Sequence, residues 1–235
     1  MVDADTIRQR LAEVRDRMGR AARTGGRDPA AVRLVAVSKT FPVEYVRAAA
    51  RAGQVDFGEN KVQEALQKKR ATTDLVIKWH LIGHLQSNKA RKAGAEFDAV
   101  HSVDSPSLVA ALDEAAQAAG RQIELLVQVD LFGEATKHGA REDMLGAVFD
   151  RARECRGARL TGLMLLPPAV DEPEAARPYF RALVALRDRL RANGVPPSML
   201  AELSMGMSHD FEVAIEEGST IVRIGTAIFG DRPRF

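Results

Sequence analysis

The fold is decided by the stretch Leu34-Val35-Ala36-Val37-Ser38-Lys39-Thr40. Successive side chains of a strand point to opposite faces, so Lys39 shares a face with Val35 and Val37. Both faces are apolar up to Val37, which is typical of a strand covered on both sides in a parallel α/β sheet. Lys39 then follows the carboxyl end of the strand, where such sheets hold their ligands. A lysine in this place could equally extend its amine into solvent, and the rest of the chain decides between the two interpretations.

Seven more stretches of strand character follow at regular intervals. They span residues 55–58, 79–82, 99–103, 123–129, 160–165, 203–204 and 221–224. Segments of helical character lie between them, at residues 42–52, 61–70, 88–95, 105–119, 141–153, 173–193 and 210–217. Eight strands that alternate with helices predict an α/β fold with one (β/α)8 barrel of the TIM type over residues 32–230.

An additional helix is expected before the barrel, within residues 1–26. Its apolar stripe recurs at steps of four, three and four residues and is formed by Ile7, Leu11, Val14 and Met18. No proline-rich or serine-rich hinge interrupts the chain, so residues 1–235 are expected to form a single domain. The alternative is a doubly wound open sheet, but no Gly-x-Gly-x-x-Gly fingerprint follows the first strand.

The composition describes a globular protein with little net charge. Of the 235 residues, 46% are hydrophobic and 28% are charged, and the formal net charge is +2. The basic clusters at residues 68–70 and 89–92 have acidic residues nearby and no aromatic residues between them, which is typical of solvated helix faces. We therefore expect no nucleic-acid partner, and no metal site is predicted.

The cysteine content and the apolar runs indicate the cellular location. Cys155 is the only cysteine, so no disulfide can form within the chain. Residues 1–10 are charged and lack the apolar core of a signal peptide. No apolar run approaches the ~20 residues of a membrane span. We therefore expect a cytoplasmic protein without a membrane partner.

Polar side chains follow several of the predicted strands. In a parallel barrel the functional face is built from the carboxyl ends of the strands and the loops after them. Lys39 ends the first strand, Asn60 follows the second, and His80 and His84 lie on and after the third. Lys137 lies in a long loop after the fifth strand. These side chains are the first candidates for a ligand site.

The last two strands are followed by turns rich in glycine and hydroxyl groups, Ser204-Met205-Gly206-Met207-Ser208 and Gly225-Thr226-Ala227-Ile228-Phe229-Gly230. Barrels usually bind phosphate with the loops after strands seven and eight, together with a helix N-terminus. Gly206 and Gly225 would let backbone N–H groups approach an anion. Hydroxyl donors would come from Ser204, Ser208 and Thr226. Each turn alone is ordinary loop chemistry, but the two together at these positions predict a phosphate site.

Arg223 places a guanidinium inside the otherwise apolar strand 221–224. Burying that charge without a partner would be costly. One interpretation is a structural ion pair with an inward-facing acid such as Glu124 or Glu202. The other is a site for pyridoxal phosphate, to which proteins supply a Schiff-base lysine, a phosphate site and an Asp or Arg at the pyridine nitrogen.

Six motifs that occur in order along the chain bear on this choice. They are residues 35–40 (VAVSKT), 57–60 (FGEN), 79–83 (WHLIG), 85–89 (LQSNK), 203–208 (LSMGMS) and 222–230 (VRIGTAIFG). In these motifs the sequence resembles the pyridoxal phosphate homeostasis proteins, which are similar in fold to the barrel domain of alanine racemase. The resemblance extends from about residue 32 to residue 230. It departs at Lys61, where an aromatic residue is expected, and at His84, and both departures concern the mouth of the site.

The resemblance implies a role for each matching residue. Lys39 would form the Schiff base with pyridoxal 5'-phosphate, and Arg223 would meet the pyridine nitrogen. Asn60 and His80 would line the inner wall. The turns that hold the phosphate would comprise Ser204, Met205, Gly206, Ser208, Gly225 and Thr226.

The resemblance further implies a protein that binds, stores and delivers the cofactor and keeps the free aldehyde low, without robust catalytic turnover. Its partners would be pyridoxal phosphate and the apoenzymes that depend on it, and the protein would be a monomer. Two alternatives stay open. One is a one-domain amino acid racemase, in which His80 would be the second acid–base group beside Lys39. The other is a Schiff-base aldolase that uses no cofactor.

Overall fold

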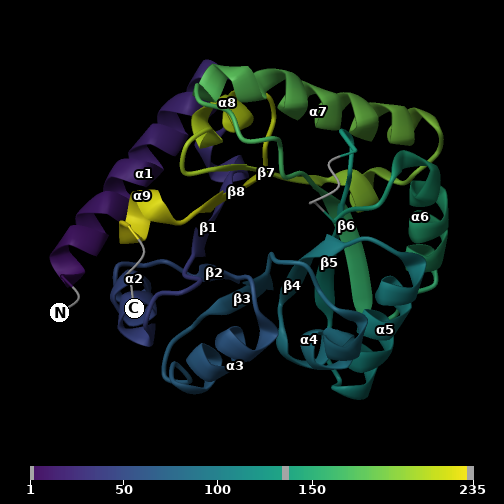
Figure 1. Cartoon of the computed structure of the whole chain (residues 1–235), viewed down its shortest axis with the longest axis horizontal. Coiled ribbons are helices and arrows are strands. Elements are labelled where there is room, and N and C mark those ends of the chain that lie inside the picture. The colour runs from purple at the N-terminus through teal and green to yellow at the C-terminus, as the bar shows by residue number, and fades with distance from the viewer. Residues whose placement is uncertain (1–2, 134–137, 232–235) are drawn as a thin grey trace.

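The computed structural model describes residues 3–133 and 138–231. Within these residues eight parallel strands form a closed barrel in the order β1 to β8, as Figure 1 shows. The strands are β1 (Arg33–Val37), β2 (Asp56–Glu59), β3 (Lys78–Leu81), β4 (Ala99–Val103), β5 (Ile123–Gln128), β6 (Ala158–Met164), β7 (Glu202–Met207) and β8 (Ile221–Ile224). The last strand pairs with the first, with Val35 opposite Arg223. The predicted (β/α)8 barrel is confirmed.

Helices follow the strands and surround the barrel (Figure 1). The helices after the strands are α2 (Val43–Arg51), α3 (Val62–Arg70), α4 (Ala90–Glu96), α5 (Pro106–Ala118), α6 (Leu145–Arg153), α7 (Arg177–Ala192), α8 (Phe211–Glu216) and α9 (Thr226–Phe229). Short 3-10 turns occupy Pro29–Ala31, Ser87–Lys89, Glu142–Met144, Pro173–Ala176 and Pro197–Leu200. The sequence did not predict α9, because four residues are too few to show helical periodicity.

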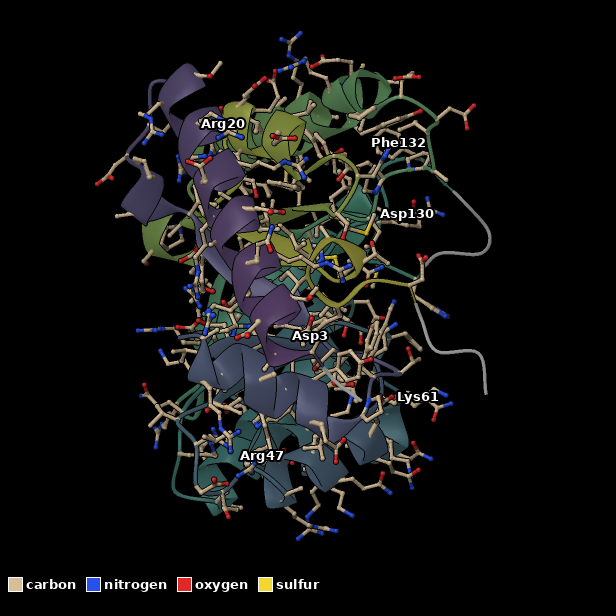
Figure 2. The ribbon with its side chains drawn as sticks, turned by 90° about the vertical axis from the view of Figure 1, so that its left-hand side faces the viewer. Asp3, Arg20, Arg47, Lys61, Asp130 and Phe132 are labelled. Atoms are coloured by element: carbon tan, nitrogen blue, oxygen red, sulfur yellow. The ribbon has the colours of Figure 1, made fainter. Side chains whose placement is uncertain are left out.

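The N-terminal helix α1 (Ala4–Thr24) lies against the outside of the barrel. Its start is capped by the Asp3 side chain, which accepts from two backbone N–H groups of the first turn. The helix contacts α2, α8 and α9, and Figure 2 shows it crossing the face of the molecule from Asp3 past Arg20. All four residues of its predicted apolar stripe are buried, namely Ile7, Leu11, Val14 and Met18. The helix therefore joins elements from both ends of the chain.

The core has two parts of very different size. The larger part fills the layer between the strands and the helices. The smaller part lies inside the barrel and is formed by Val35, Leu126, Met164 and Ile221. Barrel interiors are usually filled by branched apolar side chains, but buried polar side chains share this interior, among them those of His80, His101, Ser204 and Arg223. None of the described helices is both long and apolar enough to cross a membrane.

Candidate functional site

A cavity of about 420 Å³ lies at the carboxyl ends of the strands. This is where a parallel barrel builds its functional site, and the volume suits a small organic ligand. The cavity is lined by Val37, Lys39, Asn60, Ile82, Gly83, His84, Gln128, His138, Leu166, Met207, Ser208, His209, Arg223, Gly225 and Thr226. It therefore collects residues that are up to 189 positions apart in the sequence, from Val37 to Thr226.

Most of the predicted site residues meet in this cavity. Those that line it are Lys39, Asn60, Ser208, Arg223, Gly225 and Thr226. His84 also lines it, whereas Lys61 is exposed at the start of α3 (Figure 2). Lys137 lies outside the described residues.

Lys39 is carried by a short turn that begins where β1 ends at Val37. Thr40, the next residue, has a φ of 68°, which is an uncommon conformation for any residue with a β-branched side chain. Its backbone N–H donates to Glu64 Oε1 at 2.6 Å. A carboxylate of α3 thus holds the strained residue directly after the lysine.

The other side of this turn is held by a buried lysine. Lys68 of α3 is 6% exposed and donates from Nζ to the Ser38 carbonyl oxygen at 2.7 Å. The same Nζ donates to Glu59 Oε1 at 2.7 Å and to Glu64 Oε1 at 2.8 Å. The Ser38 hydroxyl also donates to Glu59 Oε1, at 2.6 Å. The residues before and after Lys39 are therefore fixed by one cluster, which we call the Lys68 cluster (Ser38, Glu59, Glu64 and Lys68).

The Lys68 cluster contains two carboxylates for one ammonium group. Burial raises the pKa of Glu59 to about 7, although the nearby Lys68 opposes the shift. Such a shift is expected where a buried carboxylate must share its only cation with a second acid. Among the described residues, Glu59 Oε2 has no hydrogen-bond partner. The cluster is thus a buried charged unit behind the lysine, and each of its members depends on Lys68.

The predicted phosphate turns meet at Ser208. Its Oγ accepts from the backbone N–H of Gly225 at 3.1 Å and from that of Ala227 at 3.3 Å. Both lone pairs of the oxygen are then used, so the hydroxyl hydrogen is available to a ligand. Ser208, Gly225 and Thr226 all line the cavity. This end of the cavity presents hydroxyl groups in the arrangement that anions require.

Arg223 is 3% exposed and lines the cavity from β8. Its Nη1 donates to Ser204 Oγ at 2.6 Å and its Nη2 donates to the Leu165 carbonyl oxygen at 2.9 Å. Burial lowers the pKa of Arg223 to about 10, opposed by Asp210, so the group stays charged near neutral pH. A buried cation with neutral partners has donors left for a ligand in the cavity.

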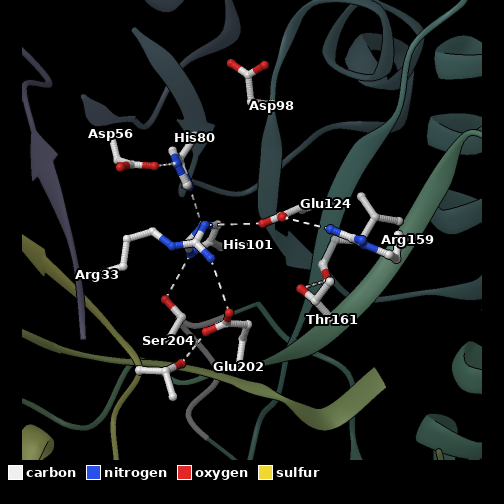
Figure 3. A network of polar contacts seen from close by, with 12 residues as sticks. Arg33, Asp56, His80, Asp98, His101, Glu124, Arg159, Thr161, Glu202 and Ser204 are labelled. Carbon is white, nitrogen blue, oxygen red and sulfur yellow. Dashed lines mark hydrogen bonds and ion pairs between the residues drawn. The ribbon is translucent and has the colours of Figure 1, made fainter. Parts of the chain in front are cut away.

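The expected alternative, an ion pair of Arg223 with Glu124 or Glu202, is not made. Both acids instead bind Arg33, at 3.3 and 3.2 Å, as Figure 3 shows. Arg33 begins β1, so it enters the barrel from the opposite end to the Lys39 cavity. No carboxylate within the described ranges forms an ion pair with Arg223.

The structure places His80 on the inner side of the barrel but away from the Lys39 cavity, which corrects its prediction as a residue of the cofactor site. Its ring bonds to Asp56 Oδ1 and to His101 Nε2, both at 2.9 Å, and it borders a smaller cavity of about 190 Å³ that Arg33 also lines. Inward-facing positions alternate along a strand, so Ile82, two residues further on, takes the place at the Lys39 cavity. His80 lies one layer deeper.

Three residues of the first predicted phosphate turn also fall outside the cavity lining. Ser204 is fully buried and its Oγ accepts from Arg223. Met205 is fully buried in the layer between strands and helices. Gly206 has a φ of 95°, and a Cβ there would lie 2.6 Å from the Cβ of Ala214. Gly206 thus allows α8 to pack closely on β7, and of this predicted turn Met207 and Ser208 reach the cavity.

Several lining residues were missed by sequence reasoning. Gln128 ends β5, so the rule that selected Lys39 and Asn60 would have found it. Its amide nitrogen donates to the His138 carbonyl oxygen. The ring of His138 stacks on that of His84, with 3.6 Å between centroids. No sequence pattern signals this stack, because the two histidines lie in separate loops.

Comparison with known proteins agrees with the motifs. The family model described as alanine racemase, N-terminal domain, matches residues 2–233. A pyridoxal phosphate homeostasis protein of Pseudomonas aeruginosa is 44% identical over 227 residues, covering 97% of this chain and 96% of that protein. One of Aquifex aeolicus is 42% identical over 225 residues, covering 95% and 97%. The solved structure of PipY of Synechococcus elongatus with PLP bound is 39% identical, covers 95% of this chain and 100% of that one, and has a TM-score of 0.84. The chain therefore belongs to the family of the pyridoxal phosphate homeostasis proteins.

Proposed function

We propose that this protein binds pyridoxal 5'-phosphate and serves in its homeostasis, by storing and delivering the cofactor and limiting the free aldehyde. The observation that carries the proposal is the meeting of Lys39, Ser208 and Arg223 in one cavity of about 420 Å³. Curated relatives that cover nearly the whole chain are named for this role, and the similar PipY structure holds the cofactor.

The residues of the cavity fit the chemical groups of the cofactor. Lys39 supplies the amine for its aldehyde, and Ser208 and Thr226 supply hydroxyl donors for its phosphate. Arg223 supplies N–H donors for the pyridine nitrogen. Once bound, the cofactor contributes an aldehyde that bonds amines and a ring that withdraws electrons.

The donor character of Arg223 favours storage over catalysis. A guanidinium has no acceptor and does not release its protons near neutral pH, so it bonds the pyridine nitrogen only when that nitrogen carries no proton. An unprotonated ring withdraws electrons weakly, which disfavours carbanion chemistry. We therefore propose that the protein has no robust catalytic turnover.

The racemase alternative needs an acid or base on each side of the cofactor. His80 does not reach the cavity, and the two tyrosines pack elsewhere, Tyr45 against Phe41 and Tyr179 against Phe132. The imidazoles that do line the cavity are His84, His138 and His209. A test for turnover must therefore address these three rather than His80.

The remaining proposals concern the state of the protein. We propose that the whole chain acts as one cofactor-binding domain and that the protein is a monomer. We also propose a cytoplasmic location and the transfer of the cofactor to apoenzymes. Burial raises the pKa of the single thiol, Cys155, to about 11, so this cysteine stays protonated and unreactive.

The first prediction is that borohydride reduction of the protein with its cofactor places the pyridoxyl group on Lys39. The purified protein should absorb visible light before reduction, and peptide mapping should find the adduct on Lys39 alone. Lys39→Ala should bind more weakly and yield no adduct, while Lys61→Ala, which changes an exposed lysine, should map as the wild type. An adduct found mainly on Lys61, Lys89 or Lys137 would contradict the assignment. A colourless protein that binds no cofactor would favour the aldolase.

The second prediction is that the loaded protein does not racemise amino acids at a sustained rate. Incubation with L-alanine in deuterated water should give at most slow exchange at Cα, with no accumulation of the D-isomer, because Lys39 serves only one side of the cofactor. Chiral chromatography and mass spectrometry measure both. Sustained D-alanine production that is lost in Lys39→Ala and in a variant of His84, His138 or His209 would establish the racemase instead.

A further inference from the structure

A continuous chain of hydrogen bonds runs through the inside of the barrel. We call it the interior file (Asp56, His80, His101, Ser204 and Arg223). Asp56 Oδ1 lies 2.9 Å from His80 Nε2, and His80 Nδ1 lies 2.9 Å from His101 Nε2. His101 Nδ1 lies 2.9 Å from Ser204 Oγ, which accepts from Arg223 Nη1 at 2.6 Å. Figure 3 shows the file from Asp56 to Ser204. It connects the smaller cavity, which His80 lines, with the Lys39 cavity, which Arg223 lines.

The two ends of the file fix the direction of every hydrogen bond in it. The carboxylate of Asp56 can only accept hydrogen bonds. Burial raises the pKa of Asp56, but the hydrogen bond with His80 opposes this effect, and the pKa lies below its usual range. His80 Nε2 must therefore carry a hydrogen, and a neutral His80 accepts at Nδ1 from His101 Nε2–H. A neutral His101 then accepts at Nδ1 from the Ser204 hydroxyl, whose oxygen is free to accept from Arg223. All bonds thus point from Arg223 towards Asp56.

An additional proton on either imidazole would break this arrangement. His101 Nδ1 would then carry a hydrogen and donate to Ser204 Oγ, and Arg223 would donate to the same oxygen. The Ser204 hydrogen would be left without an acceptor among the described residues, inside a fully buried layer. Burial also lowers the pKa of His101 well below its usual range, and the nearby charge of Arg223 lowers it further. The neutral, one-directional file is therefore the favoured state.

The surrounding charges leave the file intact. Arg33 lies beside it but is held by Glu124 and Glu202 (Figure 3). Lys78 and Asp98 border the smaller cavity near His80. None of these residues bonds to His101 or Ser204. Among the described residues, the side chains of His101 and Ser204 make polar contacts only with other members of the file.

We propose that Asp56, His80, His101 and Ser204 together act as one positioning unit for Arg223. This unit orients the guanidinium and keeps its Nη1 turned into the barrel. The N–H groups of Arg223 that bond neither Ser204 nor the Leu165 carbonyl oxygen are then presented to the Lys39 cavity in one fixed orientation. The proposal deepens the proposed function and rests on it for the role of Arg223, but the order of the protons in the file does not depend on a bound cofactor.

The direct test is histidine nitrogen NMR on the wild-type protein without pyridoxal phosphate. Near neutral pH, both His80 and His101 should be neutral and protonated at Nε2 only, assigned with His80→Gln and His101→Gln variants. A cationic ring, or a hydrogen on Nδ1 of either residue, would overturn the proposal. This outcome is independent of cofactor binding, so it separates failure of the inference from failure of the proposed function, which would show as the absence of visible absorption.

A variant pair extends the test to the cofactor. Ser204→Ala removes the acceptor of Arg223 Nη1, whereas Ser219→Ala removes a fully buried serine that bonds only backbone carbonyls nearby. Ser204→Ala should weaken pyridoxal phosphate binding about tenfold, shift the absorption maximum of the bound cofactor and give mixed tautomers at His101. Ser219→Ala should match the wild type in all three. Equal spectra and affinities for the two variants would overturn the proposal.

Discussion

Lys68→Met lowers the free energy of unfolding by about 3–5 kcal/mol, the range found when one partner of a buried ion pair is removed. The Lys68 side chain is 7% exposed and donates to the carboxylates of Glu59 and Glu64 and to the Ser38 carbonyl oxygen. Methionine keeps the apolar stem but leaves these three acceptors without their common donor. Urea unfolding followed by the fluorescence of the single tryptophan, Trp79, measures the loss.

The neighbouring Lys69→Met is the matched control. Lys69 bonds Glu96, but its side chain is 35% exposed, so its loss should cost less than about 1 kcal/mol. Adding Glu59→Gln to Lys68→Met removes the unpaired buried carboxylate and should recover part of the lost stability. Equal effects of Lys68→Met and Lys69→Met would show that the Lys68 cluster does not stabilise the turn that carries Lys39.

Arg223→Met weakens the binding of pyridoxal phosphate by about 10- to 150-fold, which corresponds to the 1.5–3 kcal/mol of a hydrogen bond to a charged group. Methionine has neither donors nor a charge, but it fills a similar volume in the barrel. The free protein should stay folded, because the guanidinium has no ion-pair partner among the described residues that would be left behind. Calorimetric titration and circular dichroism measure the two quantities.

Arg223→Glu distinguishes a role at the pyridine nitrogen from simple loss of a buried cation. An ionised glutamate only accepts, so it favours a protonated ring, whereas arginine only donates. The bound cofactor should therefore absorb differently in Arg223→Glu and in Arg223→Met. Identical spectra for the two variants would show that Arg223 does not contact the ring nitrogen. If Arg223→Glu instead fails to fold, the result would favour a structural role for Arg223.

The barrel was predictable because its signals are local. Most strands appear in the sequence as short apolar runs, and the polar residues at strand ends could be placed by the rule for parallel barrels. Lys39 and Asn60 were found in this way, and Arg223 was found as a charge inside an otherwise apolar strand. The rule also indicated the turns after strands seven and eight, of which Ser208, Gly225 and Thr226 line the cavity.

The depth of a side chain along the barrel axis was not predictable. His80 and Ile82 face the same way, and Ser204 lies within β7 whereas Ser208 directly follows it, yet only the second of each pair reaches the cavity. Depth depends on the register between neighbouring strands, and β7 has an irregular register with β8 between Ser204 and Met207. A single sequence contains no direct signal for register, because register is set by contacts between strands.

The Lys68 cluster and the interior file were hidden for a related reason. Lys68 occurs in a run of basic residues that was interpreted as a solvated helix face, but α3 turns this one lysine inward to Ser38. The partners in the file come from β2, β3, β4, β7 and β8, separated by as many as 103 residues between His101 and Ser204. Only the closed fold brings them together.

The pairing of β8 with β1 also fixes when the site can form during synthesis. Val37 and Lys39 are made at the first strand, but they share their cavity with Arg223, Gly225 and Thr226, which are made at and directly after the eighth. A growing chain can form early strand–helix units, yet it cannot close the barrel before residues 221–224 emerge. A nascent chain should therefore hold no cofactor in the closed site until β8 has emerged and paired with β1.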